Sequence, residues 1–338
     1  MSTCGPFPVR AWSSIAATAL GAVLALPASA ADDPRGWLDR MGYALEYLNY
    51  EGTLVQLHGT EAAVMHVVHR VEDGVRAERI TALDDVGREI IRGGDGATCI
   101  LPDQQEVMVE QREAGQPAAS PLRDQFSRDA RFDEGLYRLA IASGGRLVGR
   151  DTRLVTVRPT DSYRYGYRLW LDHATAMPLK VQVAGDDEAV VEQLLFTAID
   201  LPERIPESSV RPSRALDKFT RQSWPRPALR AAAPASTSGW RVDFLPPGFR
   251  LAAVRAQPTG TAGSSLEHRV YTDGVASVSV FIEGGVTPLE QGEGPSRVGA
   301  ANAWTVRSGD HLVTAVGEVP ARTVEAIARS VQRTAESR

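Results

Sequence analysis

Short segments with a period of two dominate the first half of this chain. From Thr53 to Gln111, apolar and polar residues alternate in runs that turn clusters separate, and Asp73-Gly74 is typical of a tight hairpin turn. The pattern predicts an antiparallel meander. Its expected strands are Thr53–His58, Ala63–Val71, Val75–Ala82, Arg88–Arg92, Thr98–Leu101 and Val107–Gln111.

Two helices are expected beside these strands. Asp33 is a suitable N-cap and Pro34 a suitable first helical residue, and Gly52 follows the end of the pattern. The apolar stripe of this helix consists of Leu38, Met41, Leu45 and Leu48. A second helix is predicted from Asp133 to about Ala142, before two glycines, and residues 115–129 are expected to form a loop.

Strands are expected again after the second helix. They are Arg146–Gly149, Thr152–Val157, Tyr163–Leu171, Leu179–Ala184 and Val190–Ile199. An antiparallel sheet this long must curl, and a helix in its concavity would cover its apolar face.

The chain of 338 residues is long enough for about two domains, and its 43% of hydrophobic residues can fill two cores. Six prolines and two runs of small residues between Pro202 and Ser238 predict a semi-stiff linker without strands or helices. A small α+β domain is expected at residues 239–338, after a first domain at 31–201. Its expected elements are the strands Trp240–Phe244, Glu267–Thr272, Val275–Glu283, Ala303–Ser308 and His311–Val316, and a helix at Ala321–Gln332.

The first 30 residues resemble a signal peptide. Arg10 precedes an apolar run from Ala11 to Leu26, and Ala28-Ser29-Ala30 is a typical cleavage site. Cys4 lies before the apolar run, where it cannot serve as a lipidation site, and Cys99 is then the one cysteine of the mature chain. An exported chain without an internal disulfide predicts a location in the bacterial periplasm.

Neither a catalytic motif nor a metal or cofactor motif emerges from the sequence. His66 and His69 are three residues apart in an expected strand, so their side chains point to opposite faces and cannot easily share a metal ion. Cys99 is expected to be a small core residue with no neighbouring base. Acidic residues outnumber basic ones 42 to 37, which disfavours a nucleic-acid-binding protein. We therefore expect no enzyme and no cofactor.

One expected strand carries an unusual concentration of aromatic residues. Tyr163, Tyr165, Tyr167 and Leu169 would share one face of it, and Arg164, Arg168 and Trp170 the other. Sheet propensity and ordinary core packing are the first explanation of this pattern. The functional interpretation is a concavity that takes an apolar chain, with arginines close enough to bind an anion. The four residues of the first face are the candidate lipid-binding residues.

Several segments resemble the MucB/RseB family of periplasmic sigma-E regulators. In the first half they are Leu48-Asn49-Tyr50-Glu51-Gly52-Thr53, Gly149-Arg150, Tyr167-Arg168-Leu169-Trp170-Leu171-Asp172 with Thr175, and Met177-Pro178-Leu179-Lys180. The second domain is similar in Trp240 with Leu245-Pro246-Pro247-Gly248-Phe249, Val270-Tyr271-Thr272-Asp273-Gly274 with Ser279-Val280-Phe281-Ile282-Glu283, and the segment 313–320. The lipoprotein carriers LolA and LolB share the strand pair near Trp170, so the second domain separates the two families.

The resemblance implies a half-open antiparallel β-barrel, like that of LolA and LolB, with helices in its concavity, and a smaller α+β domain. It also implies binding to the periplasmic segment of a transmembrane anti-sigma factor of the MucA/RseA type. That binding would shield the segment from the site-1 protease, and lipid or lipopolysaccharide would release it. Candidate partner-binding residues are Trp240, Phe249, Tyr271 and Phe281. The alternative function is a periplasmic carrier of lipid or lipoprotein, and a homo-oligomer stays open.

Overall fold

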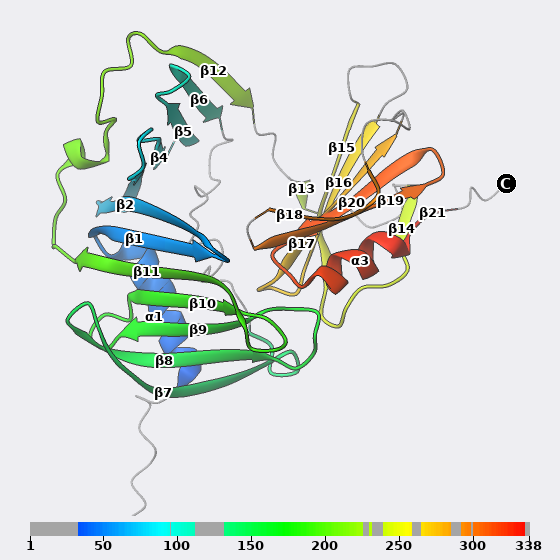
Figure 1. Cartoon of the computed structure of the whole chain (residues 1–338), viewed down its shortest axis with the longest axis horizontal. Coiled ribbons are helices and arrows are strands. Elements are labelled where there is room, and N and C mark those ends of the chain that lie inside the picture. The colour runs from blue at the N-terminus through cyan, green and yellow to red at the C-terminus, as the bar shows by residue number, and fades with distance from the viewer. Residues whose placement is uncertain are drawn as a thin grey trace, which may run out of the picture. The chain divides into compact units, whose positions relative to one another are not determined.

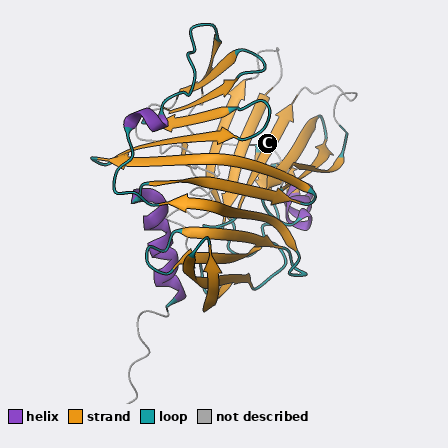
Figure 2. Ribbon diagram, turned by 60° about the vertical axis from the view of Figure 1, so that its left-hand side comes forward, coloured by secondary structure: helices purple, strands orange, loops and turns teal. Residues whose placement is uncertain are grey.

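The computed structural model describes residues 33–94, 96–111, 132–225, 230–231, 239–258, 265–284, 292–298 and 300–334. The expected signal peptide, the expected loop at 115–129 and much of the second half of the expected linker lie outside these ranges. From Asp33 onward the chain is one compact unit that contains two large sheets (Figures 1 and 2).

The first sheet has 12 strands in the described residues, in the order β12-β6-β5-β4-β3-β2-β1-β11-β10-β9-β8-β7. Neighbours are antiparallel except β12, which runs parallel to β6. Its strands are β1 (Tyr50–His58), β2 (Glu61–Glu72), β3 (Val75–Ala82), β4 (Glu89–Gly93), β5 (Gly96–Leu101), β6 (Glu106–Gln111), β7 (Tyr137–Leu147), β8 (Arg150–Pro159), β9 (Gly166–Asp172), β10 (Pro178–Ala184), β11 (Val190–Asp200) and β12 (Thr220–Pro225). Because β7 and β12 are its two edges, the sheet is open, as the resemblance implies.

Helix α1 (Pro34–Tyr47) packs against this sheet, as the sequence predicts (Figure 1). Asp33 caps it, since its carboxylate accepts hydrogen bonds of 3.1 Å from the backbone nitrogens of Arg35 and Gly36. The buried face of α1 meets alternate residues of the strands in a single apolar core. That core includes Trp37, Met41, Leu45, Leu54, Val155, Val157, Tyr167, Leu169, Val181 and Phe196.

The prediction of a second helix at residues 133–142 is wrong. Asp133 begins a single turn, in which its carbonyl accepts a hydrogen bond from the backbone nitrogen of Tyr137, and the chain then extends as β7. From Tyr137 to Ile141 the buried and partly buried apolar side chains alternate with exposed residues, which is the period of a strand. Pairing with β8 along the length of β7 outweighs the local helix signal.

The linker expected at residues 202–238 contains regular structure, which corrects that prediction. A short 3₁₀ helix, η2 (Glu207–Val210), places Val210 beside Ile205 and Val68 in a small apolar cluster. The carboxylate of Glu89, fully buried, accepts hydrogen bonds from the backbone nitrogen and the hydroxyl of Ser213. Strand β12 then lies beside β6. The first half of the expected linker therefore belongs to the first sheet.

The second sheet has seven strands in the described residues, in the order β13-β15-β16-β17-β20-β19-β18. Its strands are β13 (Arg230–Ala231), β15 (Arg250–Pro258), β16 (Ser265–Thr272), β17 (Ser277–Gly284), β18 (Gly294–Val298), β19 (Ala301–Ser308) and β20 (His311–Gly317). Helix α3 (Ala321–Ser330) packs on β19 and β20, and β14 (Trp240–Val242) pairs with β21 (Val331–Arg333). Strands β13, β15, β18 and β21 are absent from the sequence-based expectation. The expected fold class, α+β with an open first sheet and a smaller second domain, is confirmed.

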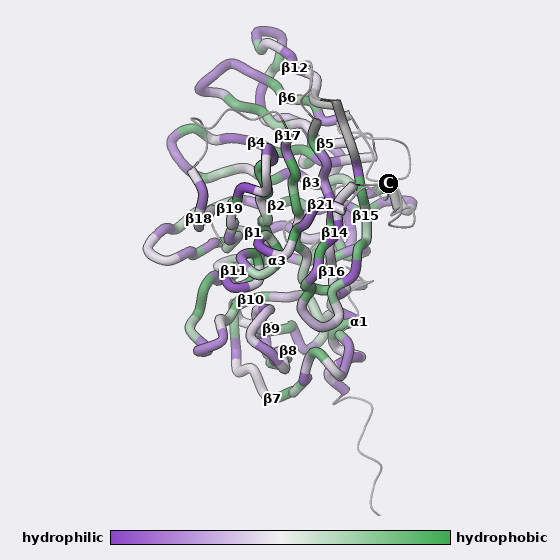
Figure 3. The backbone as a smooth tube through the Cα atoms, turned by 90° about the vertical axis from the view of Figure 1, so that its right-hand side faces the viewer, coloured by the Kyte–Doolittle hydropathy of each residue, from purple (hydrophilic) through white to green (hydrophobic). Residues whose placement is uncertain are grey.

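Hydropathy follows the strand period in both sheets (Figure 3). In β17, buried and partly buried or exposed residues alternate along the strand, and Val278, Val280 and Ile282 form the core under α3. None of the helices in the described ranges has the length and apolar character that a bilayer crossing requires.

Candidate functional site

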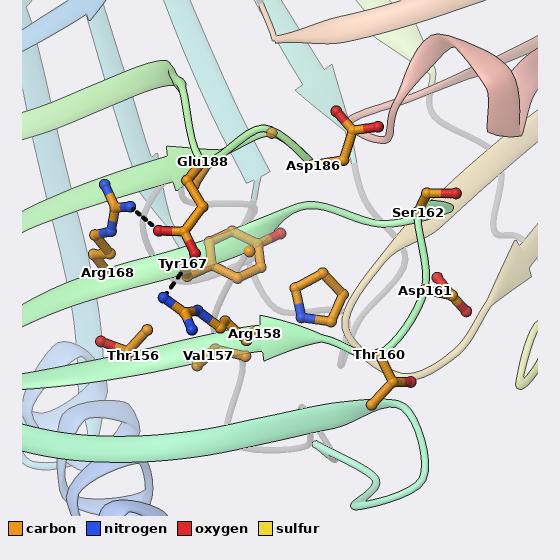
Figure 4. Close-up of a pocket in the computed structure, with 14 residues that line it drawn as sticks. Thr156, Val157, Arg158, Thr160, Asp161, Ser162, Tyr167, Arg168, Asp186 and Glu188 are labelled. Atoms are coloured by element: carbon orange, nitrogen blue, oxygen red, sulfur yellow. Dashed lines mark hydrogen bonds and ion pairs between the residues drawn. The ribbon is translucent and has the colours of Figure 1, made fainter.

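A pocket of about 310 Å³ opens where β8 and β10 end and β9 begins (Figure 4). The segment 160–162 after β8 and the loop between β10 and β11 form its rim. Its lining comprises Thr156, Val157, Arg158, Pro159, Thr160, Asp161, Ser162, Gly166, Tyr167, Arg168, Ala184, Gly185, Asp186 and Glu188. Charged and hydroxyl side chains dominate this list, so the pocket suits a polar ligand.

Gly166 and Ala184 leave space in the pocket because they carry almost no side chain. They lie opposite each other in the register of β9 and β10. A Cβ atom at Gly166 would lie 3.0 Å from the carbonyl oxygen of Val157 and 3.2 Å from Cδ of Pro159. A larger residue at this position would therefore push β8 and β9 apart.

Two arginines in the pocket converge on one carboxylate. Arg158 Nη2 lies 2.6 Å from Glu188 Oε1, and Arg168 Nη2 donates to Glu188 Oε2 at 2.8 Å. The three side chains are partly exposed, with 64%, 27% and 51% of their surface accessible for Arg158, Arg168 and Glu188. Water can thus reach the ion pairs, and they can exchange for other partners.

The rim of the pocket also contacts α3. Arg322 donates to Ser162 Oγ at 2.9 Å and to Asp186 Oδ2 at 2.8 Å. Its neighbour Thr323 donates to the carbonyl oxygen of Tyr163 at 2.7 Å. The loops that line the pocket therefore hold the beginning of the helix that covers the second sheet.

Behind the pocket, a buried cluster of polar groups joins the two sheets. Arg164 is fully buried, and its Nη1 donates to Asp273 Oδ2 at 2.7 Å. Its Nη2 donates to the carbonyl oxygen of Pro247 at 2.6 Å, and its Nε to Asp161 Oδ1 at 3.1 Å. The hydroxyl of Tyr137 donates to the same oxygen of Asp273 at 2.8 Å. Burial, followed by the charge of Asp273, raises the pKa of Tyr137.

Structure places the four candidate lipid-binding residues in two different environments. Tyr167 and Leu169 lie in β9 and are buried in the core under α1. Tyr163 and Tyr165 precede β9, so the expected strand from residue 163 is too long. Tyr165 is also buried at the margin of this core, and its hydroxyl accepts a hydrogen bond of 2.9 Å from the side-chain amide of Asn302 in the second sheet. The two earlier tyrosines therefore contribute to the contact between the sheets.

Three of the four candidate partner-binding residues are core residues of the second domain. Trp240, Phe249 and Tyr271 are at most 8% exposed. Phe281 is half-buried, and its ring stacks on His268 with a centroid distance of 4.3 Å. The first three stabilise the fold around β14, β15 and β16, and Phe281 is the one of the four with appreciable exposure.

The two histidines and the cysteine considered in the sequence analysis make contacts within the fold. His69 is buried, and its Nδ1 lies 2.9 Å from the carbonyl oxygen of Leu48, whereas His66 faces Glu51 at 3.3 Å. Cys99 is half-buried, which departs from the expected core position, and burial raises the pKa of its thiol. Within the described ranges, the metal-ligating side chains do not gather into a group that could hold an ion.

Sequence reasoning noted Arg168 and missed its partners in the pocket. Glu188 lies in the acidic segment Asp186-Asp187-Glu188, whose composition is that of an ordinary solvated turn, and Arg158 follows an expected strand and belongs to no local motif. The signal that unites them is the register of β8, β9 and β10, which a single sequence does not contain.

Two domain-family models together match most of the chain. The MucB/RseB N-terminal domain matches residues 33–214, and the MucB/RseB C-terminal domain matches residues 234–332. The Sigma factor AlgU regulatory protein MucB of Pseudomonas aeruginosa is 28% identical over 326 residues, which cover 93% of this chain and 95% of that protein. The Sigma-E factor regulatory protein RseB of Escherichia coli K12 is 22% identical over 306 residues, 90% of this chain and 92% of that protein.

Solved structures give a consistent result. The crystal structure of MucB in complex with MucA(peri) is similar with a TM-score of 0.67 and 26% identity, over 90% of this chain and 100% of that one. The crystal structure of MucB has a TM-score of 0.58 and 25% identity, over 89% and 98% of the two chains. Since both family domains match in order and together span most of its length, the chain belongs to the MucB/RseB family.

Proposed function

We propose that the protein is a periplasmic negative regulator of a sigma-E-type envelope stress response. In this role it binds the periplasmic segment of a MucA/RseA-type anti-sigma factor and shields it from the site-1 protease. The observation that carries the proposal is the match to both MucB/RseB domains, together with the similarity to MucB crystallised with MucA(peri). The signal-like N-terminus supports the periplasmic location.

The arrangement of the two sheets supports a binding role. A segment that becomes ordered on binding loses conformational entropy, so its partner must offer a large contact surface. Both sheets can contribute to one surface here, because Arg164 and Asp273, and Tyr165 and Asn302, join them through buried polar contacts. We therefore propose that the anti-sigma segment contacts both domains.

Lipid or lipopolysaccharide is the proposed releasing signal. An acyl chain in the concavity of the first sheet would meet Tyr167 and Leu169, which pack under α1. It would have to displace side chains of α1 such as Met41, which is 1% exposed. Lipid binding on this face would thus move α1, and release follows if the moved state has the lower affinity for the anti-sigma segment.

Protection from proteolysis tests the proposal. The purified chain is mixed with the periplasmic segment of the anti-sigma factor from the same organism, and cleavage by the site-1 protease is followed over time. We expect saturable binding and slower cleavage, with an unrelated periplasmic protein as the control. Absence of binding would refute the regulatory role, and binding without slower cleavage would refute the shielding.

A further inference from the structure

We propose that the pocket between the ends of β8, β9 and β10 binds a phosphate group, with Arg158 and Arg168 as its ligands and Glu188 as the internal carboxylate that it displaces. This ligand class is a phosphate monoester, either on a lipid headgroup or on a small soluble molecule. The inference does not depend on the proposed function, because binding is measured without an anti-sigma factor.

Charge in the pocket favours an anion. Two of its three carboxylates already have cationic partners outside the lining: Asp161 binds Arg164, and Asp186 binds Arg322. Arg158 and Arg168 then share the single carboxylate of Glu188. Within this group of three, two positive charges face one negative charge. Arg164 is shared between Asp161 and Asp273, so the surplus belongs to this group and not to the whole pocket.

Geometry favours phosphate over the carboxylate already present. Each guanidinium uses one Nη2 group on a different oxygen of Glu188, at 2.6 Å and 2.8 Å, so both converge on one point. A phosphate monoester carries about −1.5 to −2 charges at neutral pH and offers three acceptor oxygens. Arginine binds such groups through several N–H donors at once. Thr156, opposite Arg168 in the strand register, adds a hydroxyl on the same side (Figure 4).

Glu188 is held in an unfavourable backbone conformation. Its φ of 61° lies in the left-handed region, which is unfavourable for a residue other than glycine. The loop around it is closed by a hydrogen bond of 2.9 Å from the backbone nitrogen of Gly185 to the carbonyl oxygen of Ala189. The turn itself fixes this backbone conformation, so the two partly exposed ion pairs determine how strongly the Glu188 side chain competes with an anion.

Phosphate binding in the pocket affects the second domain through the loop that contains Glu188. Asp186, two residues before Glu188, binds Arg322 at 2.8 Å, and Arg322 also binds Ser162 in the lining. When phosphate displaces Glu188, the loop loses an anchor and the pair between Asp186 and Arg322 becomes less favourable. Phosphate binding should therefore loosen the start of α3.

Titration of the full-length chain with glycerol 3-phosphate, followed by NMR, tests the binding. Glu188→Gln should tighten binding about two- to fivefold, because a partly exposed competing ion pair is lost. Arg168→Gln should weaken it about tenfold, because a charge-assisted hydrogen bond is lost. Arg204→Gln, at an exposed arginine outside the lining, should leave the affinity unchanged. Circular dichroism checks that each variant folds.

Two further measurements complete the test. Vesicles of phosphatidylcholine with a minor fraction of phosphatidic acid distinguish the two sources of the phosphate. If the vesicles compete with glycerol 3-phosphate for the protein, the ligand is a lipid headgroup. If glycerol 3-phosphate binds and the vesicles do not, the ligand is a soluble phosphate. Hydrogen exchange at the amides of Ala321–Val324 should accelerate when phosphate binds and in Glu188→Gln. Absence of saturable binding of either probe, or equal affinities for Glu188→Gln, Arg168→Gln and the unmodified chain, would refute the site.

Discussion

Arg164 and Asp273 form an ion pair of 2.7 Å in which both side chains are fully buried, although 109 residues separate them in the sequence. The carboxylate of Asp273 accepts four hydrogen bonds, from Arg164, the hydroxyl of Tyr137 and the backbone nitrogens of Val275 and Ala276. A buried charge is tolerated only when its partners satisfy it in this way. This buried pair is therefore a central part of the contact between the two sheets.

Replacement of Asp273 by asparagine should strongly destabilise the protein. It leaves the Arg164 guanidinium buried with only part of its countercharge, and breaking a buried pair of this kind costs about 3–5 kcal/mol. Urea unfolding measures the loss. Asp243→Asn, which breaks an exposed pair with Arg241, serves as the matched control and should leave the unfolding midpoint unchanged. Equal midpoints for the two variants would contradict the structural role of Asp273.

Tyr137→Phe isolates one hydrogen bond of the same cluster. The variant keeps the ring beside Arg164 and removes the hydroxyl that donates to Asp273. A hydrogen bond to a charged acceptor is worth about 1.5–3 kcal/mol, so the free energy of unfolding should fall by that amount. Tyr43→Phe, on the exposed side of α1, is the control. A loss no larger than that of the control would show that water replaces the hydroxyl.

Stability should fall at alkaline pH. Burial is the first cause that raises the pKa of Tyr137, Tyr165, Tyr167 and Tyr271, so the folded state keeps these phenols protonated. The unfolded chain ionises them near their ordinary pKa of about 10. Their contribution is thus complete below pH 10 and is lost as pH rises above it. Urea midpoints across this range measure the slope, which Tyr137→Phe should reduce. A pH-independent midpoint would contradict the burial of the phenols.

Gly248→Ala should weaken the contact between the sheets. The residue has a φ of 79°, and a Cβ atom there would lie 2.3 Å from Cδ1 of Leu136 in the first domain. Strain and the shift of Leu136 together should cost about 1–3 kcal/mol in thermal or urea unfolding. Gly239→Ala, with open space around the added methyl group, is the matched control. A Gly248→Ala variant as stable as this control would show that Leu136 moves without cost.

Cys99 should react slowly with thiol reagents at neutral pH. Burial raises its pKa, although Arg88 and Arg92 lower it by a smaller amount, so little thiolate is present. Alkylation of the folded protein should be slower than that of the urea-unfolded protein. Cys99→Ala should keep partner binding and lose less than about 1 kcal/mol of stability, as expected for a small half-buried side chain. Fast alkylation in the folded state would contradict the low thiolate fraction.

Local patterns predicted many strands of the first sheet, because the residues of a half-buried strand alternate between apolar and polar. Strand β3 matches the predicted Val75–Ala82 at both ends, and the cap at Asp33 is confirmed. The same reasoning failed at residues 133–142. There a helix-like turn at Asp133 precedes strand β7, and the alternation from Tyr137 to Ile141 was the better signal.

Contacts between residues that are far apart in the sequence could not be predicted, for a different physical reason. The tyrosines near β9 share an alternating pattern, and Tyr165 and Tyr167 are both buried, but the hydroxyl of Tyr165, which precedes β9, contacts Asn302 of the second sheet. The carboxylate of Glu188 meets Arg158 because the strands between them fold back on one another. Pairings of this kind depend on the whole topology, and no local period records them.

Parallel pairing of β12 with β6 affects how the molecule is assembled during synthesis. Strand β6 ends at residue 111, yet the strand that completes its edge starts at residue 220. While the chain is synthesised from its N-terminus, the backbone N–H and C=O groups on that side of β6 stay unpaired until β12 is made. An uncovered edge of this kind can pair with a strand from another molecule. A fragment that stops at residue 201 would keep this edge open permanently. Such a fragment should aggregate more readily than one that extends to residue 225.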